Sequence, residues 1–375
     1  MNNQPIRVAH IVGKWLGGGV ESMLMNYYKY IDKNNIQFDF ICDNDSTNIP
    51  YEEIEKMGGR VILIPPYQKV FKYHKELKRV LSSENYKIVH SHINTLSVFS
   101  LYAAKCAGVP VRIAHSHSTI INNNREFKRN VIKNILKYFS KLFATEYFAC
   151  SDMAAISQFG KKTFNSGKVI VINNAIDIER FKYDESIRMA KRKELNINNN
   201  TLVIGHIGRF VETKNHSFLI QIFDEIHKNN QDSKLLLAGQ GPLENEIKSK
   251  VIEMGLDDAV IFLGQRDDVN ELYQVFDIFL LPSLYEGLPV VGVEAQASGL
   301  LCFFTNNMTK NAKVIESTEF MSITDSAQTW ALKILDAYPF FKRKDTSEQI
   351  SDCNLNISVE SKKLEKIYID FYNYK

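Results

Sequence analysis

Residues 7–31 read RVAHIVGKWLGGGVESMLMNYYKYI, and this stretch indicates the fold class. An apolar run at residues 7–12 is followed by a glycine-rich turn and then by apolar side chains at helical spacing over residues 20–31. Short apolar runs that alternate with helical patterns are typical of parallel sheets whose strands are connected by helices. The opening of the chain therefore predicts an α/β fold with a doubly wound parallel sheet.

The same alternation runs through both halves of the chain. The strands predicted in the first half are residues 7–12, 38–42, 61–64, 87–89, 111–114, 147–150 and 169–172. After a polar stretch, the strands predicted in the second half are residues 203–207, 234–238, 260–263, 278–281 and 301–304. Since 375 residues exceed one ordinary core, we predict an N-terminal domain over 1–172 and a C-terminal domain over 173–357. A helix over 358–375 is expected to pack back onto the first domain.

Charge and cysteine content narrow the class of protein. Residues 1–180 hold 24 Lys and Arg against 15 Asp and Glu, although the net charge of the chain is only +3. A basic half favours an anionic partner, such as membrane lipid, nucleic acid or a phosphate-bearing acceptor. No recognisable nucleic-acid module accompanies the charge, so nucleic acid is the weakest of these. Five scattered cysteines, no signal-peptide pattern and no span-length apolar run predict a cytoplasmic protein.

Two loops that follow predicted strands could bind an anion. Gly17-Gly18-Gly19 precedes a helix, where backbone N–H groups and the helix end favour negative charge. The alternative is a tight turn without a ligand. Arg209 and Lys214 follow the strand at 203–207, at the end of a parallel strand where α/β sheets bind ligands. These cations are suited to a pyrophosphate, and the alternative is a solvated pair at a helix start.

The segment Glu286-Gly287-Leu288-Pro289 and the later Glu294 carry the strongest signal. With Pro289 as the first helical residue, Gly287 and Leu288 would present free amides at a helix N-terminus. The helix that follows is small and apolar almost all round, which predicts burial. A buried Glu294 then needs a partner, either an internal cation or ligand hydroxyls such as a ribose diol.

These features together resemble the retaining nucleotide-sugar glycosyltransferases of the GT-B fold. The likeness is narrower to the bacterial family-four group that builds capsular polysaccharides and exopolysaccharides. The residues that carry it are Gly18-Gly19-Val20-Glu21, Cys150-Ser151, Gly208-Arg209, Lys214, Gly239-Gln240-Gly241, and Glu286 and Glu294 with seven residues between them. The resemblance implies two Rossmann-like domains that face each other across a cleft. In the loop after residues 301–304 the chain departs from the family, which leaves the donor sugar undetermined.

The resemblance also implies roles for individual residues. Glu294 would hold the ribose of the donor, Glu286 the hydroxyls of the transferred sugar, and Arg209 with Lys214 the diphosphate. Gly18 and Gly19 would contribute to the donor site. The implied co-substrate is a nucleotide sugar, with uridine diphosphate as the commonest nucleotide, and no metal cofactor is expected.

Two histidine pairs end neighbouring predicted strands, His90-Ser91-His92 and His115-Ser116-His117. An imidazole at such a strand end could bond a hydroxyl of donor or acceptor. The resemblance implies a sugar contact for one histidine after the fifth strand, and we favour His117 over His115. We expect the two members of each pair to point to opposite faces and find no third ligand, so no metal site is predicted.

The predicted helix near residues 127–143 is basic and amphipathic, which suits contact with anionic lipid. Its basic residues, counted from the loop before it, are Arg125, Lys128, Arg129, Lys133, Lys137 and Lys141. An ordinary core helix with a solvated basic face is the alternative. The function predicted is sugar transfer to a glycan or lipid-linked glycan, at the inner face of the cell membrane if that helix binds lipid. A nucleotide-sugar epimerase and a non-enzymatic nucleotide-sugar-binding protein are the alternatives.

Overall fold

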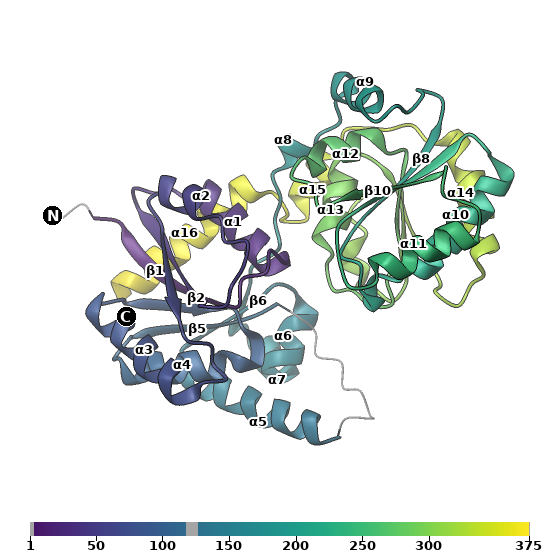
Figure 1. Cartoon of the computed structure of the whole chain (residues 1–375). Helices are drawn as coiled ribbons and strands as arrows, with labels where there is room; N and C mark the ends of the chain where they lie inside the picture. Colours follow the sequence, from purple (N-terminus) through teal and green to yellow (C-terminus); the bar gives the residue numbers. More distant parts are fainter. Residues whose placement is uncertain (1–3, 118–126, 375) are drawn as a thin grey trace. The chain divides into compact units, whose positions relative to one another are not determined.

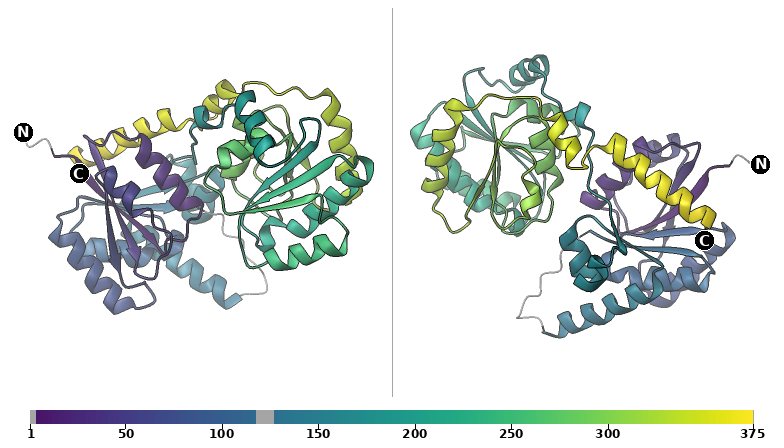
Figure 2. Two further views of the ribbon diagram at one scale, coloured as in Figure 1. Left: turned by 45° about the horizontal axis from the view of Figure 1, so that its top comes forward. Right: turned by 180° about the vertical axis from the view of Figure 1, so that it is seen from behind.

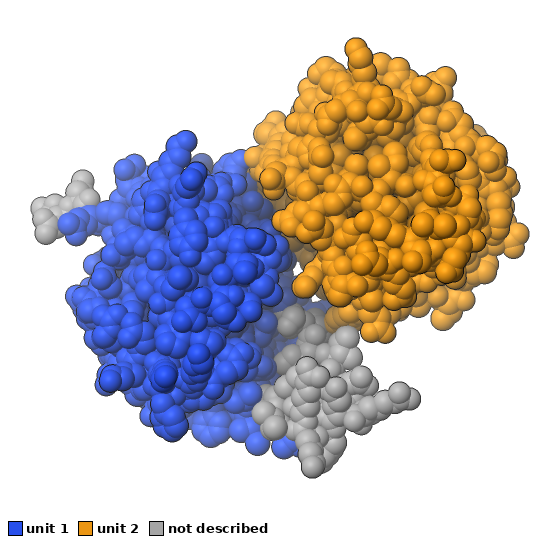
Figure 3. Space-filling model, in the orientation of Figure 1, with its two compact units in different colours: residues 1–175, 357–375 blue, residues 176–356 orange. Residues whose placement is uncertain are grey.

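The computed structural model describes residues 4–117 and 127–374 of the 375-residue chain. It divides into two compact units, residues 1–175 with 357–375 and residues 176–356 (Figure 3). The last helix of the chain therefore belongs to the first unit. Each unit is a parallel sheet with helices on both of its faces (Figures 1 and 2).

Unit 1 contains seven strands in the order β3-β2-β1-β4-β5-β6-β7, all parallel. The strands are β1 Ile6–Gly13, β2 Ile36–Asp43, β3 Arg60–Ile64, β4 Ile88–Ser91, β5 Val111–Ser116, β6 Glu146–Ala149 and β7 Val169–Val171. The helices are α1 Gly19–Tyr30, α2 Tyr51–Lys56, α3 Val70–Ser83, η1 Asn94–Leu96, α4 Ser97–Cys106, α5 Phe127–Phe143, α6 Asp152–Phe159, α7 Lys161–Asn165 and α16 Ile357–Tyr374. Strand order reverses between β1 and β4, the place where doubly wound sheets bind ligands.

The core of unit 1 explains why the chain returns to it at the end. Every residue of β2 is buried, as expected for a parallel strand that is covered on both faces. Leu364 and Tyr368 of α16 pack in the same apolar cluster as Val8 and Phe38. Tyr368 is fully buried there. The apolar spacing in the last helix is thus used for packing against the first sheet.

Unit 2 contains six parallel strands in the order β10-β9-β8-β11-β12-β13. The strands are β8 Leu202–Ile207, β9 Ser233–Ala238, β10 Val260–Gly264, β11 Ile278–Leu281, β12 Leu301–Thr305 and β13 Thr318–Met321. The helices are α8 Ile178–Phe181, α9 Glu185–Glu194, η2 Glu212–Lys214, α10 His216–Asn229, α11 Glu244–Glu253, α12 Val269–Val275, α13 Val290–Ala297, η3 Lys310–Ala312, α14 Ala327–Ala337, η4 Tyr338–Phe340 and α15 Ser347–Asp352. Here the strand order reverses between β8 and β11.

Every predicted strand is present, and the predicted doubly wound α/β class is confirmed. The strand predicted at 87–89 lies slightly later, because His90 and Ser91 are buried in the sheet despite their polarity. The edge strand β13 was not predicted, since its four residues, TEFM, are too few and too mixed to show a period. In the described part of the chain, no helix has both the length and the apolar character needed to cross a bilayer.

Candidate functional site

The loops after β8 and β11 flank the point where the strand order of unit 2 reverses. They are tied together by backbone and side-chain hydrogen bonds. Leu284 N–H donates to the carbonyl of Thr213 at 2.8 Å, and the Asn215 amide donates to the carbonyl of Pro282 at 3.1 Å. Because both loops follow carboxyl ends of parallel strands, their side chains meet at one edge of the sheet.

Lys214 and Glu286 form an ion pair across these two loops. Both side chains are 18 % exposed, and Glu286 also accepts a hydrogen bond from the Ser283 hydroxyl at 3.2 Å. The ion pair holds the long lysine side chain in one place beside Glu286. The structure therefore brings together two residues that the sequence assigned to one donor site.

Arg209 lies on the same edge and is exposed. Among residues 4–117 and 127–374, no carboxylate forms an ion pair with it, so its guanidinium is free for an anion. The loop that carries it is packed backbone to backbone against the next one. A Cβ on Gly239 would stand 2.1 Å from the carbonyl oxygen of Gly208, and one on Gly241 would stand 2.4 Å from that of Phe210. These glycines are needed because no side chain fits between the two loops.

Helix α13 begins one residue later than predicted. Pro289 is the N-cap, with an extended backbone, and the first helical residue is Val290. Gly287 and Leu288 thus lie in the loop before the cap, and the amides at the helix end are those of Val290 and Val291. In the described residues no backbone acceptor pairs with the N–H of Gly287 or Leu288. All four N–H groups lie near the positive end of the helix dipole, which favours an anion there.

Of the partners considered from sequence, no internal cation forms an ion pair with Glu294 of α13 among the described residues, and a tyrosine binds it instead. Its carboxylate accepts a hydrogen bond from the Tyr273 hydroxyl at 2.9 Å, and that hydroxyl also lies 3.0 Å from the carbonyl of Val291. Burial raises the pKa of Glu294 to about 7, while the Tyr273 hydrogen bond and the charge of Arg180 oppose the rise. The second carboxylate oxygen is left available to a further donor.

The glycine loop of unit 1 is closed by a carboxylate of the chain itself. Gly17 has φ +77°, and α1 begins at Gly19 with Gly18 as its cap. Glu21, which is buried, accepts a hydrogen bond from Leu16 N–H at 3.0 Å. A Cβ on Gly18 would lie 3.1 Å from this carboxylate. A ligand anion at Gly18 and Gly19 would therefore share the helix end with Glu21.

The two histidine pairs of unit 1 do not have the orientation expected from sequence. Residues two apart in a strand point to the same face, and the ring centroids are 4.2 Å apart for His90 and His92 and 3.9 Å apart for His115 and His117. A fifth ring, His10 of β1, joins them with its Nδ1 3.0 Å from His92 Nε2. The expectation of opposite faces was wrong, and so was the statement that no third nitrogen ligand is near.

Burial keeps these imidazoles neutral. It lowers the pKa of His10 and of His117 to about 3 and holds those of His90, His92 and His115 well below the ordinary value. His117 is the member that keeps some exposure, and its backbone N–H donates to the Asn94 side chain at 2.7 Å. Of the two candidates, His117 can therefore reach a ligand, whereas His115 is 1 % exposed.

Comparison with known proteins decides the family. Residues 17–180 match the family model described as Glycosyltransferase Family 4, and residues 188–339 match the one described as Glycosyl transferases group 1. The Bacillus subtilis protein EpsF, which is named as a glycosyltransferase, is 33 % identical over 341 residues, covering 90 % of this chain and 89 % of EpsF. The chain belongs to the family-four type of glycosyltransferases. It is thus a glycosyltransferase enzyme with the GT-B fold.

Two further similarities extend over most of this glycosyltransferase. An Escherichia coli protein named UDP-Gal:alpha-D-GlcNAc-diphosphoundecaprenol alpha-1,3-galactosyltransferase is 25 % identical, covering 80 % of this chain and 79 % of that protein. The crystal structure of Anabaena HepE in complex with UDP superposes with a TM-score of 0.77 at 16 % identity, covering 97 % of this chain and all of HepE. The second similarity supports the GT-B fold.

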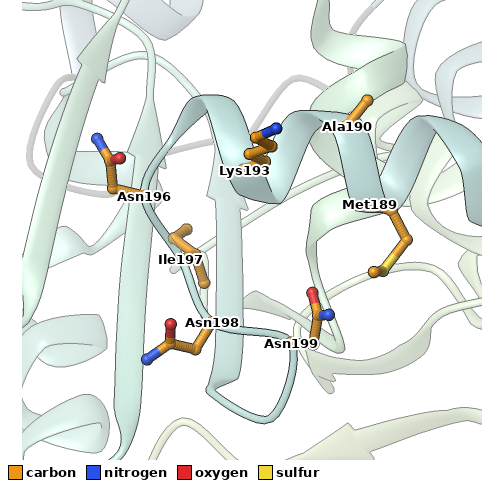
Figure 4. Close-up of a pocket in the computed structure, with 7 residues that line it drawn as sticks. All are labelled: Met189, Ala190, Lys193, Asn196, Ile197, Asn198 and Asn199. Atoms are coloured by element: carbon orange, nitrogen blue, oxygen red, sulfur yellow. The ribbon is translucent and has the colours of Figure 1, made fainter.

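The glycosyltransferase also has a shallow hollow of about 640 Å³ that lies apart from these residues. It is lined by Met189, Ala190, Lys193 and residues 196–199 (Figure 4). These residues come directly before β8, at the amino end of the strand, opposite the edge where parallel sheets bind ligands. The hollow is therefore not part of the candidate site.

Some residues of the site were missed from sequence. Tyr273 lies in α12 and becomes the partner of Glu294 only through packing. His10 stands in an apolar strand, two residues before the buried Val12. Because residues two apart in a strand share a face, this spacing was the sequence signal that the His10 side chain is buried as well. His206 and His216 lie beside Gly208 and Lys214 with buried ring nitrogens that have no partner in the described residues. Their lowered pKa values mean that they add no positive charge.

Proposed function

We propose that this glycosyltransferase takes a sugar from a UDP-sugar and transfers it, with retention of the anomeric configuration, to a glycan or lipid-linked glycan in polysaccharide biosynthesis. The observation that carries the proposal is the arrangement after β8 and β11, where Lys214 lies with Glu286 at one edge of the sheet. Arg209, which has no ion-pair partner in the part of the chain that the structure describes, lies at the same edge. UDP is favoured because it occurs in the HepE complex and in the donor of the E. coli relative.

In the proposed mechanism the chain's own groups stabilise the departing diphosphate. Cleavage at the anomeric carbon leaves negative charge on the diphosphate oxygen, and fixed cations and N–H groups lower the energy of that charge as it develops. Arg209 and Lys214 supply the cations, and the loop before α13, with Gly287 and Leu288, supplies N–H groups. We propose that no metal ion bridges the diphosphate, because these groups provide the positive charge.

The carboxylates are proposed to position the donor. Glu294 accepts hydrogen bonds from the ribose hydroxyls, since one of its oxygens is not used by Tyr273. Glu286 contacts hydroxyls of the transferred sugar from its place beside Lys214. His117 is proposed to contact the sugar from unit 1, while the buried His115 supports it. Gly18 and Gly19 are also proposed to contact the donor, at a helix end that the Glu21 carboxylate occupies as well.

The acceptor side of the proposal rests on α5 and on the E. coli relative, whose named acceptor carries a diphosphoundecaprenol lipid. Exposed apolar side chains recur on one stripe of α5, namely Val131, Ile135, Tyr138 and Leu142, at 41 to 64 % exposure. A stripe of this kind suits the interface of a membrane. We propose that α5 rests on the inner face of the cell membrane and that the enzyme is otherwise cytoplasmic.

The lysines of α5 that the structure describes do not support the basic face on which membrane contact was first predicted. Lys137 donates to the carbonyl of Ser157, and Lys141 donates to that of Phe159 at 3.2 Å, so both point into the protein. The side chains of the remaining basic residues lie outside the described part of the structure, which holds for Arg125, Lys128, Arg129 and Lys133. Membrane contact is therefore proposed from the apolar stripe, with lipid charge as a secondary factor.

A thermal-shift screen of nucleoside diphosphates and nucleotide sugars tests the donor assignment. A ligand at 100 times its dissociation constant adds about 2.7 kcal/mol to the free energy of unfolding. UDP and at least one UDP-sugar are expected to raise the unfolding temperature, and ADP and GDP to raise it less. Equal shifts for all nucleosides, or none, would contradict the choice of UDP.

The alternative functions make different predictions in a transfer assay. An epimerase would convert a nucleotide sugar without any acceptor, and a binding protein would hold the donor without turnover. The family assignment makes glycosyl transfer the activity of the chain and gives neither alternative support. Incubation of each stabilising donor with and without lipid-linked acceptor separates the three outcomes. Retention is read from the anomeric configuration of the product by NMR.

A further inference from the structure

Five histidines form one continuous layer at the carboxyl end of the unit 1 sheet. They come from three adjacent strands, β1, β4 and β5, and from the residues just after them, and the members are His10, His90, His92, His115 and His117. Two sets of three have ligand atoms that lie within 4.8 Å of one another, His10 with His90 and His92, and His92 with His115 and His117. So many imidazoles on one face exceed what a single sugar contact requires.

Hydrogen bonds between the rings leave part of this layer unsatisfied. His92 uses both ring nitrogens, one toward His10 at 3.0 Å and the other toward His117 at 2.9 Å. His115 uses only Nδ1, toward His90 Nε2 at 3.0 Å, and its buried Nε2 has no partner in the described residues. His10 Nε2 in the same layer also has no partner in the described residues. A buried polar atom without a partner is costly, so the layer has bonding capacity that a ligand among the rings would satisfy.

We propose that His92, His115 and His117 form a site for one Zn²⁺ ion, bound through His92 Nδ1, His115 Nε2 and His117 Nε2. Three histidines around zinc leave a fourth position for water or a hydroxyl oxygen. The ligands belong to unit 1, whereas the residues proposed to hold the diphosphate belong to unit 2. The two proposals share His117 and His115, and the sugar contact would then be made through the fourth position of the ion. The donor residues of unit 2 do not depend on zinc, and zinc content is measured without a donor, so failure of one proposal is distinguishable from failure of the other.

The second set of three is preferred to the first for two reasons. Binding between His92, His115 and His117 breaks only the hydrogen bond from His92 to His117, because His115 Nε2 is already free. His90, in the other set, already uses both of its nitrogens, toward His115 and toward the Tyr368 hydroxyl. His117 is also partly exposed, which provides a path for the ion, whereas His10 and His90 are buried.

The surroundings of the proposed ligands match what zinc sites require. A zinc-bound imidazole normally bonds a second group through its other nitrogen, which fixes the ring and its tautomer. His92 does so toward His10, and His115 does so toward His90, which Tyr368 holds in turn at 2.7 Å. Nitrogens bound to tetrahedral zinc lie about 3.4 Å apart, so the 2.9 Å between His92 Nδ1 and His117 Nε2 must widen by about half an ångström. The separations from the ligand nitrogen of His115 are within 4.8 Å and must settle at the same value.

Metal analysis of the full chain tests the proposal. The chain is purified without a polyhistidine tag, stripped with EDTA, incubated with Zn²⁺, desalted and measured by inductively coupled plasma mass spectrometry. About one zinc per chain is expected. The variants His117→Ala and His115→Asn should lose this zinc. His74→Ala, a matched control at a half-buried histidine of α3 outside the layer, should keep it.

Two further measurements separate a metal site from a merely hydrogen-bonded layer. Co²⁺ in place of Zn²⁺ should give the intense visible absorption of a tetrahedral site, and His117→Ala should abolish it. His10→Asn, which removes a supporting bond and no ligand, should weaken zinc binding ten- to a hundredfold. His117 lies at the rim of the layer, so His117→Ala decides the matter even if His115→Asn fails to fold. No zinc above the EDTA-treated blank, or full zinc retention in folded His117→Ala, would overturn the proposal.

Discussion

Protonation of Glu294 should control nucleotide binding near neutral pH. Its pKa of about 7 means that about nine-tenths of the carboxyls are ionised at pH 8 and about one-tenth at pH 6. Only the ionised form accepts hydrogen bonds from both ribose hydroxyls while it also accepts one from Tyr273. We therefore expect the Kd for UDP to rise about tenfold from pH 8 to pH 6, equivalent to about 1.4 kcal/mol.

The variant Glu294→Gln provides the matched control, because UDP itself also takes up a proton in this range. In the variant the Kd should follow only the titration of UDP. At pH 8 it should lie about ten- to a hundredfold above the wild-type value, since a hydrogen bond to a charged group contributes about 1.5–3 kcal/mol. Isothermal titration calorimetry at pH 6, 7 and 8 measures both proteins. Parallel pH dependence in the two proteins would refute the assignment of Glu294 to the ribose.

The same variant has a predicted effect on the stability of the free enzyme. Folding raises the pKa of Glu294 from 4.5 to about 7, so this group favours the folded state below pH 4.5 and loses that contribution as the pH rises through 7. At pH 8 the ionised carboxylate costs about 3 kcal/mol. Glu294→Gln should therefore raise the free energy of unfolding at pH 8 by up to this amount, and change it little at pH 4.

Other parts of the structure give three more predictions. Lys214→Ala should lower turnover about a hundredfold through loss of charge stabilisation, whereas Lys333→Ala, at an exposed ion pair of the same unit, should not. Equal activity of both variants in a radiolabelled transfer assay would contradict the role of Lys214. Asp39→Ala should lower the free energy of unfolding, measured in urea at pH 7, by about 3 kcal/mol, because the fully buried carboxylate binds Arg7, Arg60 and Tyr86. A loss of less than about 1 kcal/mol would show that these contacts contribute little to stability. Ile135→Glu with Leu142→Glu should release the enzyme from phosphatidylglycerol vesicles in flotation assays without loss of folding, and unchanged flotation would exclude α5 as the contact.

The local spacing of apolar residues was sufficient to predict most of the fold. Strand β8 is buried along its length and β1 from Val8 onward, and their apolar runs and alternation with helices are visible over a few residues. The same holds for α5, whose bounds coincide with the predicted range. Strand β13 was not predicted, because a short edge strand has too few residues to show an alternation of apolar and polar side chains. The start of α13 was misplaced by one residue because Pro289 has an extended backbone, with ψ 118°, which composition does not reveal.

The sequence by itself determined the α/β class, the two series of strands and the charged residues that follow β8 and β11, because these depend on neighbours along the chain. Tertiary structure alone decided which groups meet. Lys214 pairs with Glu286 across 72 positions, and His10 reaches His92 across 82. Such contacts depend on strand order and register, which bring distant segments to one sheet edge. The pKa of Glu294 and the layer of histidines follow from that packing, since burial and partners set both.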